Sequence, residues 1–308
     1  MSFYPKSLTL GQRYVTPADI LVAGDYEITE KVDGSQFSFY WKEDGTLVCR
    51  SKKGSIDLNT TNKMFSSAVG YLKSLPSELT ATFVGYEFFG ESIFRPRHNV
   101  LEYARTPRHN VILFNLKHGD EFLPISDPRT AEFAEKLDLE VVPTFDVRVS
   151  SKEDLQKLLE TESVLGGCKI EGVVVKRYGH FVLGNETRQM LGAKFVSEAF
   201  KEVMTGKKKN PKKDAWTEIK ESYATEARYA KAVQALREAG ELTGTNKDIG
   251  PLIKHVHQDI IEENAAQIKE QLWAVFSKQL LSTATKALPD WYKNQLLEET
   301  LREMQNAN

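Results

Sequence analysis

The first two-thirds of the chain arrange apolar and polar residues in short alternating runs, a pattern typical of β-strands. Residues 36–41 alternate at period two, and the Asp44-Gly45 pair that follows predicts a hairpin turn into a second strand at residues 46–50. Similar runs predict further strands at residues 82–89, 110–116, 172–176 and 180–183. Residues 26 to about 194 are therefore expected to form a module rich in β-structure.

Three helices are predicted among these strands, at residues 60–75, 128–137 and 152–160. Asp127 and Pro128 supply the N-cap and a first-turn proline of the second helix. Ser150 and Glu153 have the spacing of a capping box at the start of the third helix.

Beyond residue 200 the strand pattern ends and the chain becomes helical. Apolar residues at helical spacing predict helices at residues 214–239, 251–287 and 290–304. The middle helix carries an apolar stripe, which we interpret as a bundle core: Leu252, Val256, Ile260, Ile261, Ile268, Leu272, Val275 and Phe276. A basic, proline-broken segment precedes these helices and suits a domain linker. We therefore predict an α+β domain at residues 1–204, a basic linker at 205–213 and an all-helical domain at 214–308.

Composition narrows the possible functions without naming one. The 308 residues suffice for two domains. The formal charge of −2 is unlike the global basicity of typical nucleic-acid binders. If the chain binds a nucleic acid, its basic residues must therefore be concentrated in one part of the surface. Cys49 and Cys168 lack metal-site spacing, which fits a reduced protein. Residues 1–6 contain no apolar signal core, and no apolar run approaches membrane-spanning length. We expect a cytoplasmic protein without membrane contact.

Two short motifs carry the candidate chemistry. Residues 30–35, Glu-Lys-Val-Asp-Gly-Ser, place Lys31 just before a tight turn, and Glu171 and Lys176 stand at opposite ends of an apolar strand. A lysine attacks phosphorus only without its proton, and burial or nearby positive charge lowers its pKa from about 10.4. Taken alone, the first motif also fits an exposed lysine before a hairpin.

Glu171 and Lys176 are an odd number of positions apart, so in a regular strand they would face opposite sides. Two explanations would allow both to reach one ligand. Either the strand bulges, or Glu171 lies on the turn before it, as Gly172 permits.

Together these motifs resemble motifs I and IV of the covalent nucleotidyltransferases, the ligases and mRNA-capping enzymes that carry a nucleotide on a lysine. Residues 51–54, Ser-Lys-Lys-Gly, resemble motif Ia, with Lys52 where the family usually has arginine and Arg50 as a possible substitute. The resemblance covers about residues 26–202, with the six motifs in family order.

The remaining motifs each contribute one residue. Residues 83–90 resemble motif III, in which Glu87 would bind the ribose, and residues 111–116 resemble motif IIIa, in which Phe114 would stack on the purine. Residues 190–198 resemble motif V through Lys194, with Gly192 where the family commonly carries a second lysine.

The resemblance implies an antiparallel-sheet, ATP-grasp-like ligase fold, with residues 1–204 as an adenylyltransferase domain. It implies that Lys31 attacks the α-phosphate of ATP and carries AMP, with Mg²⁺ or Mn²⁺ served by Glu171. Lys176 and Lys194 would join Lys31 as catalytic residues by neutralising phosphate charge. The implied nucleotide-binding residues are Glu30, Gly34, Lys52, Glu87, Phe114, Lys176 and Lys194.

The helical tail resembles that of the phage-type RNA ligases, especially the type 2 family, whereas DNA ligases and capping enzymes carry a β-barrel after motif V. The resemblance implies an ATP-dependent RNA repair ligase, acting as a monomer, that joins 3′-hydroxyl and 5′-phosphate ends in duplexed or nicked RNA. RNA contacts are expected from the lysines of residues 207–213 and from a second basic cluster: Arg95, Arg97, His98, Arg105, Arg108 and His109.

Two alternatives stay open. One is a DNA ligase or a GTP-dependent capping-type nucleotidyltransferase, which would use the same chemistry. The other is a non-catalytic RNA-binding module that kept a ligase fold. A P-loop ATPase is disfavoured, because residues 244–247, Gly-Thr-Asn-Lys, lack the glycine-rich spacing of a Walker A motif.

Overall fold

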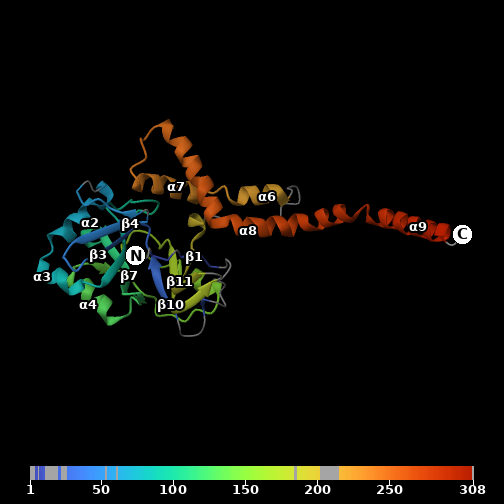
Figure 1. Cartoon of the computed structure of the whole chain (residues 1–308). Helices are drawn as coiled ribbons and strands as arrows, with labels where there is room; N and C mark the ends of the chain where they lie inside the picture. The colour runs from blue at the N-terminus through green and yellow to red at the C-terminus, as the bar shows by residue number, and fades with distance from the viewer. Residues whose placement is uncertain are drawn as a thin grey trace. The chain divides into compact units, whose positions relative to one another are not determined.

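A computed structural model describes residues 4–5, 7–10, 20–21, 26–52, 54–59, 62–183, 186–201 and 215–306 (Figure 1). Its contacts divide the chain into two compact units. The first comprises Met1–Lys201 with Ala230–Asp248, and the second comprises Glu202–Tyr229 with Ile249–Asn308. The predicted basic linker at 205–213 lies outside the described residues.

The first unit contains two sheets. The larger has the strand order β5-β4-β3-β6-β7-β8, and β9 also pairs with β7 in parallel. Its strands are β3 (Ser35–Trp41), β4 (Leu47–Ser51), β5 (Gly54–Ser55), β6 (Tyr86–Ser92), β7 (Val111–His118), β8 (Glu121–Leu123) and β9 (Glu140–Val141). The smaller has the order β1-β11-β10-β2, with β1 (Leu8–Thr9), β2 (Glu27–Lys31), β10 (Gly172–Leu183) and β11 (Glu186–Val196). All pairings except β1 with β11 and β7 with β9 are antiparallel.

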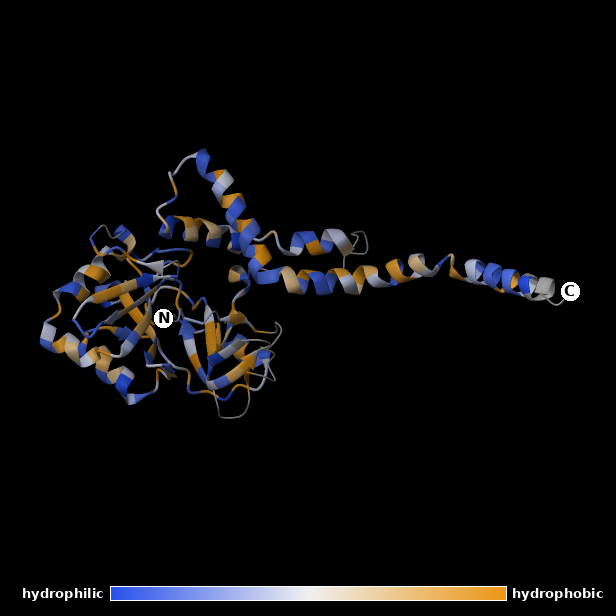
Figure 2. Cartoon of the chain, viewed as in Figure 1, coloured by the Kyte–Doolittle hydropathy of each residue, from blue (hydrophilic) through white to orange (hydrophobic). Residues whose placement is uncertain are grey.

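Helices pack on both sheets and bury their apolar faces. The helices of this part are α2 (Lys63–Ser74), α3 (Ser77–Thr80), α4 (Pro128–Lys136) and α5 (Lys152–Leu158), with short 3₁₀ turns at Ala81–Phe83, Arg108–Asn110 and Glu198–Phe200. Phe65 of α2 and Phe133 of α4 join Phe37, Phe39 and Phe88 in the core of the larger sheet. The strands of both sheets accordingly carry many hydrophobic residues (Figure 2).

The chain crosses from one sheet to the other at residues 32–34, because β2 belongs to the smaller sheet and β3 to the larger. The predicted turn after Lys31 is confirmed, but the alternative of a simple hairpin is wrong, since β2 pairs with β10 and not with β3. Asp33 and Gly34 therefore join two sheets.

Several element boundaries differ from the sequence prediction. Residues 81–83 form a 3₁₀ turn and not a strand, and β6 continues to Ser92. The strands predicted at 172–176 and 180–183 are one strand, β10. The third helix is capped by Ser151, whose Oγ accepts from Asp154 N at 3.2 Å, so the predicted Ser150–Glu153 capping box is wrong by one residue.

The last third of the chain is helical, as predicted, but its helices differ in detail. The region contains α6 (Ala215–Ser222), α7 (Glu226–Glu238), α8 (Ile249–Thr285) and α9 (Leu288–Asn306), with a 3₁₀ turn at Asn246–Asp248. The helix predicted at 214–239 is thus two helices. Arg228 is buried there, with an ion pair to Asp259 and a hydrogen bond from Nη2 to Asn264 Oδ1 at 2.8 Å.

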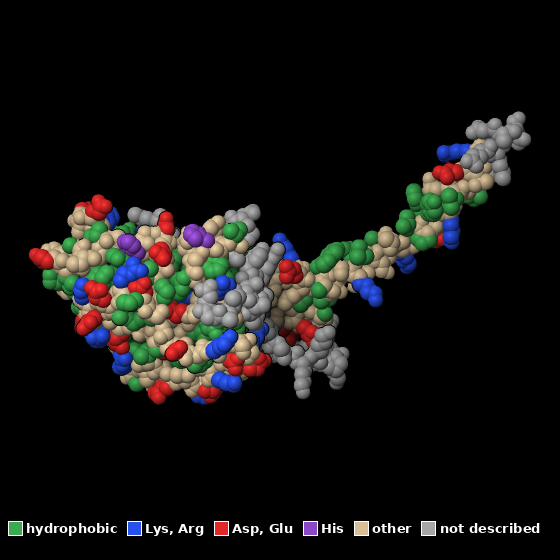
Figure 3. Space-filling view, turned by 90° about the horizontal axis from the view of Figure 1, so that it is seen from below, with side chains coloured by type: hydrophobic (Ala, Val, Ile, Leu, Met, Phe, Trp, Pro, Cys, Tyr) green, Lys and Arg blue, Asp and Glu red, His purple; other side chains and the backbone are tan. Residues whose placement is uncertain are grey.

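The apolar stripe of α8 is not the bundle core that we predicted. Ile261 is 61% exposed, and Val275 and Phe276 are about 40% exposed. Apolar side chains remain open to solvent along α8 and α9 (Figure 3). Among the described residues, no helix is both long enough and apolar enough to cross a membrane.

A segment from the last third of the chain completes the first unit. Within Ala230–Asp248, Ala232 and Leu236 of α7 are buried. Asn62 Nδ2, at the N-cap of α2, donates to the carbonyl oxygens of Arg237 and Glu238 at 3.4 and 3.3 Å. The predicted domain division at residue 204 stays a proposal, and these contacts join residues 230–248 to the first unit.

We expect a chain that ends after Asp248 to melt at a higher temperature than one that ends after Lys201. The shorter chain loses the buried side chains of α7. It also loses the two hydrogen bonds from Asn62, and each hydrogen bond contributes about 0.5–1.5 kcal/mol to the free energy of unfolding. Thermal unfolding followed by circular dichroism should show a midpoint lower by roughly 5–15 °C in the shorter chain. Equal midpoints would contradict a structural role for residues 230–248.

Candidate active site

The register of the smaller sheet brings Lys31 and Glu171 together. Lys31 is the last residue of β2, and it lies opposite Gly172, the first residue of β10. Glu171 therefore lies just before its strand, and its Oε2 accepts a hydrogen bond from Lys31 Nζ at 2.7 Å. Of the two explanations for the odd spacing of Glu171 and Lys176, the position on the turn is correct.

Lys31 lies among three carboxylates. Burial lowers the pKa of its amine, but the negative charges of Glu171, Glu91 and Asp33 outweigh burial and keep the pKa above its ordinary value. Burial raises the pKa of Glu91 to about 8 and also raises that of Glu171. The carboxylates therefore keep a proton on Lys31 until a cation draws their charge away.

Residues from both sheets line one cavity beside Lys31. The lining residues are Tyr4, Ser7, Thr29, Glu30, Lys31, Val32, Glu91, Phe114, Val142, Val174 and Lys176. β2 and β10 contribute from the smaller sheet, and β6 and β7 contribute from the larger. The cavity thus lies where the two sheets meet, next to the crossing at residues 32–34.

Glu91 is the acidic residue of β6 that lines this cavity, whereas the sequence analysis chose Glu87. Glu91 Oε2 is buried and has no hydrogen-bond partner among the described residues. Glu87 pairs with Arg50, whose Nη1 lies 3.1 Å from Glu87 Oε1, and it is not among the described residues that line the cavity. A buried oxygen without a partner is an atom that a bound ligand can satisfy.

The sequence signal for Glu91 was the glycine before it. The register between β6 and β7 shifts between Phe89 and Gly90, and a Cβ at Gly90 would lie 2.5 Å from the Ile112 carbonyl oxygen. Glycine within a strand marks such a close approach, and a bulge re-aims the residue that follows.

Lys176 and Phe114 are held side by side at the cavity. Lys176 is 1% exposed, and its Nζ donates to the Phe114 carbonyl oxygen at 2.5 Å and lies 5.7 Å from the centre of the Phe114 ring. Burial lowers the pKa of Lys176 to about 8, against the opposing charge of Glu27. Tyr4 packs edge-on against Phe114 with ring centres 5.0 Å apart. A buried ammonium and an aromatic ring are therefore fixed next to each other.

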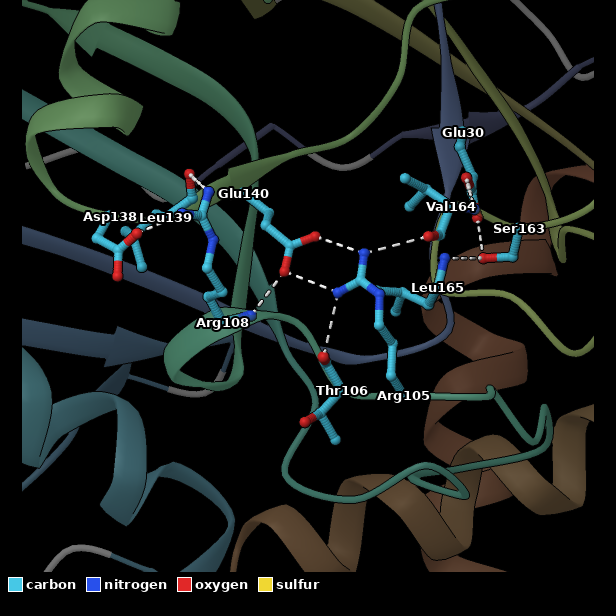
Figure 4. Close-up of polar contacts among 10 residues, drawn as sticks. All are labelled: Glu30, Arg105, Thr106, Arg108, Asp138, Leu139, Glu140, Ser163, Val164 and Leu165. Carbon is cyan, nitrogen blue, oxygen red and sulfur yellow. Dashed lines mark hydrogen bonds and ion pairs between the residues drawn. The ribbon is translucent and has the colours of Figure 1, made fainter.

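The Glu30 carboxylate is occupied by a loop. Its Oε1 accepts a hydrogen bond from Ser163 Oγ at 2.6 Å, and its Oε2 accepts one from Val164 N at 3.0 Å (Figure 4). Burial raises the pKa of Glu30, while these two hydrogen bonds oppose the rise. Glu30 also lines the cavity, so it links the cavity wall to the 163–164 loop.

The other predicted residues occupy different places. Gly34 abuts Glu91, because a Cβ on Gly34 would lie 2.8 Å from the Cβ of Glu91. Lys194 of β11 is half-buried, and its charge lowers the pKa of Glu171 in opposition to burial. Lys52 is exposed on the turn between β4 and β5, and it is not among the described residues that line the cavity.

Asp33 has a positional role that the sequence analysis did not assign. Its Oδ2 accepts hydrogen bonds from Val100 N at 2.8 Å and Leu101 N at 2.9 Å, and its Oδ1 accepts one from Asn99 Nδ2 at 3.2 Å. Its own backbone N–H donates to Tyr103 Oη at 2.7 Å. The residue therefore fixes the crossing turn against the 99–103 loop.

Much of the basic cluster predicted to contact RNA is used within the protein. Arg105 donates to both carboxylate oxygens of Glu140 and to the carbonyl oxygens of Thr106 and Val164, and Arg108 pairs with Asp138 (Figure 4). His109 and His98 also make hydrogen bonds, to Asp138 and Ser35 respectively. Arg95 and Arg97 are exposed, so their guanidinium groups can reach a ligand in solvent.

The cavity has the chemistry to hold a phosphorylated aromatic compound together with a cation. Phe114 offers a ring face, Lys31 and Lys176 offer positive charge, and Glu91 and Glu171 offer oxygen ligands. The described residues contain no group of three or more His, Cys, Asp or Glu side chains placed to hold a metal ion. Mg²⁺ typically binds one or two carboxylates plus substrate phosphates, which suits this arrangement.

Comparison with known proteins gives one family match. A family model described as RNA ligase matches residues 24–196. No curated protein matches the chain.

Solved structures of the Naegleria gruberi RNA ligase are similar at low identity. The structure with PPi shares 19% identity with a TM-score of 0.42, and the match covers 57% of this chain and 50% of that one. The structure of a lysine mutant with ATP and Mn shares 18% identity with a TM-score of 0.42, and the match covers 57% of this chain and 50% of that one. The structure of a glutamate mutant with AMP and Mn shares 18% identity with a TM-score of 0.45, and the match covers 64% of this chain and 58% of that one. The chain thus spans little more than half the length of these structures.

Glu171→Gln should lower the pKa of Lys31, because the substitution removes the negative charge that most strongly opposes burial. Modification of Lys31 by an amine-reactive reagent, followed by peptide mass spectrometry across a pH series, should reach its midpoint at a lower pH than in the parent. Glu87→Gln is the control and should leave the midpoint unchanged. An unchanged or higher midpoint in Glu171→Gln would contradict the charge balance described for Lys31.

Proposed function

The chain belongs to the RNA ligase family, and from that premise we propose that it is an ATP-dependent RNA ligase of the phage RNA ligase 2 type. It joins a 3′-hydroxyl end to a 5′-phosphate end of RNA, in a duplex or at a nick, and acts as a monomer. Its first unit is a nucleotidyltransferase domain of the ATP-grasp-like ligase class. The observation that carries the proposal is the contact of Lys31 with Glu171 beside a cavity that also contains Lys176 and Phe114.

The proposed reaction has three steps, with a phosphoramidate on Lys31 formed in the first and broken in the second. The lone pair of Lys31 Nζ attacks the α-phosphorus of ATP, the bond to the pyrophosphate oxygen breaks, and the amine loses its proton. An oxygen of the RNA 5′-phosphate then attacks the same phosphorus and releases the lysine, which leaves AMP on the RNA. The 3′-hydroxyl finally attacks the 5′-phosphorus, and AMP departs as the phosphodiester forms.

The residues in and around the cavity have distinct roles in these steps. Lys176 and Lys194 neutralise the negative charge of the phosphates, including the charge that develops on the leaving group in the transition state. The Phe114 ring packs on the base of the nucleotide. Mg²⁺ or Mn²⁺ bound at Glu171 would neutralise phosphate charge. It would also offset the negative charge of Glu171, so that the pKa of Lys31 falls and its amine can lose a proton.

Glu91 is a stronger candidate than Glu87 for the ribose of ATP. Glu91 lines the cavity, and its Oε2, which has no hydrogen-bond partner among the described residues, can accept hydrogen bonds from ribose hydroxyls. Glu87 is already paired with Arg50. Arg95 and Arg97, which are exposed, are candidate contacts for the 5′-phosphate of RNA.

Lys31→Ala should abolish transfer of label from α-labelled ATP to the protein, because a methyl side chain cannot form the phosphoramidate. The same variant should still seal RNA that was adenylylated chemically beforehand. Denaturing gels measure both reactions. Covalent AMP on the variant would contradict the assignment of Lys31.

The parent protein should take label from ATP and not from GTP, and it should seal nicked RNA in preference to nicked DNA. Transfer from GTP would favour a capping-type enzyme, and DNA sealing would favour a DNA ligase. RNA binding without any transfer would favour a non-catalytic module.

Glu91→Ala should lower kcat/KM for label transfer by about 3- to 10-fold, the value of a hydrogen bond between uncharged groups, because a carboxyl with a pKa of about 8 is largely protonated at pH 7. Glu87→Ala, four residues earlier on the same strand, should stay within about threefold of the parent once folding is verified. Rates of protein adenylylation measured over a range of ATP concentrations provide the test. A larger loss in Glu87→Ala than in Glu91→Ala would return the ribose role to Glu87.

A further inference from the structure

The C-terminal half of α7 contacts residues 34–35, which follow the strand that ends at Lys31. Gln234 Nε2 donates to the Gly34 carbonyl oxygen at 2.9 Å, and Ser35 Oγ donates to Glu238 Oε1 at 2.6 Å. Gln234 Nε2 also donates to Glu238 Oε1 at 2.9 Å, so the two helix side chains support each other. Gly34 and Ser35 are thus contacted by residues about 200 positions later in the chain.

The contact continues inward as a buried chain of hydrogen bonds with one consistent direction. Phe94 N donates to His98 Nδ1 at 3.2 Å, so the proton of a neutral ring lies on Nε2. His98 Nε2 lies 2.7 Å from Ser35 Oγ and donates to it, and the Ser35 hydroxyl proton is directed to Glu238. Burial lowers the pKa of His98 to about 4, which keeps the ring neutral at pH 7. Ser35 and His98 are 0% and 1% exposed.

Glu238 also affects Glu91, which lines the cavity. Its negative charge contributes to the raised pKa of Glu91, after the larger effect of burial. Gly34, whose carbonyl oxygen Gln234 contacts, abuts the Glu91 side chain. The end of α7 is therefore linked to Lys31 through residues 34–35 and to Glu91 through both packing and charge.

We propose that Gln234 and Glu238 are positioning residues for Lys31, which lock residues 34–35 so that Lys31 is held in place for nucleotidyl transfer. The proposal rests on the proposed function for its kinetic readout. A polar pair on a helix surface would ordinarily contribute only stability. Here the pair contacts the backbone and side chain of the turn next to the nucleophile, where a displacement of about 1 Å can cost a factor of about 100 in rate.

The test compares full-length variants at a temperature where circular dichroism shows each to be fully folded. Glu238→Ala should lower the maximal rate of label transfer from ATP by about 10-fold or more, with the KM for ATP changed by less than about threefold. Glu238→Gln should recover most of the rate, because its amide oxygen can still accept the Ser35 hydroxyl. Glu226→Ala, an exposed glutamate at the other end of α7, is the matched control and should match the parent.

A folded Glu238→Ala variant with the parental maximal rate would overturn the proposal and leave α7 a purely structural role. If Glu238→Ala does not fold, Gln234→Ala removes the hydrogen bonds to Gly34 and Glu238 but keeps both partners of the Ser35–Glu238 hydrogen bond, and it should lower the maximal rate by a few fold. A parental rate there would also overturn the proposal.

A second readout separates this proposal from the proposed function. If the parent takes no label from any nucleotide, the proposed function fails while the positioning of Lys31 can still be measured. Loosening of the turn should then alter the rate at which an amine-reactive reagent modifies Lys31 in Glu238→Ala, relative to the parent and Glu226→Ala. Identical modification rates in all three proteins would overturn the positioning role.

Discussion

The geometry of the site depends on the carboxylate of Asp33. This side chain accepts hydrogen bonds from two consecutive backbone amides and one side-chain amide of the 99–101 segment, at the point where the chain leaves one sheet for the other. The chain passes between the sheets here and again between β9 and β10, so this crossing is one of the two points at which the backbone joins them. Because Asp33 ties the crossing to the chain that follows β6, Lys31 from one sheet and Glu91 from the other keep a constant relation.

The site that results is electrostatically crowded. Glu171, Glu91 and Asp33 raise the pKa of Lys31, and the buried carboxyls of Glu91 and Glu171 have raised pKa values themselves. Such an arrangement contributes little to folding, since burial of charge costs free energy that pairing only partly offsets. Clusters of this kind are common at functional sites, where a charged ligand relieves the imbalance. The same groups whose burial is costly can therefore favour binding of a phosphate with its metal ion.

The sequence predicted the α+β class and the helical tail because strand alternation and helical spacing are local signals. The Asp44-Gly45 hairpin and the Asp127 cap were equally local, and the structure confirms both. The separation of β2 and β3 into two sheets was not predictable, since alternation does not identify a strand's partner. Glu87 was predicted from the resemblance of residues 83–90 to motif III, which does not reveal that Glu91, after the register shift at Gly90, lines the cavity. Gln234 and Glu238 look like solvent-facing polar residues of a helix, and only the tertiary contacts reveal their partners.

The contact between Ser35 and Glu238 also sets an order of events during synthesis. The two residues are 203 positions apart, and a ribosome that adds about 5–20 residues per second needs roughly 10–40 s to make the intervening chain. The last strand of the two sheets ends at Val196, so both sheets can assemble before the carboxylate that receives the Ser35 hydroxyl has been made. The turn beside Lys31 thus acquires its last partner only after residue 238 has been made, so the candidate site is completed late in synthesis and by a residue remote in sequence.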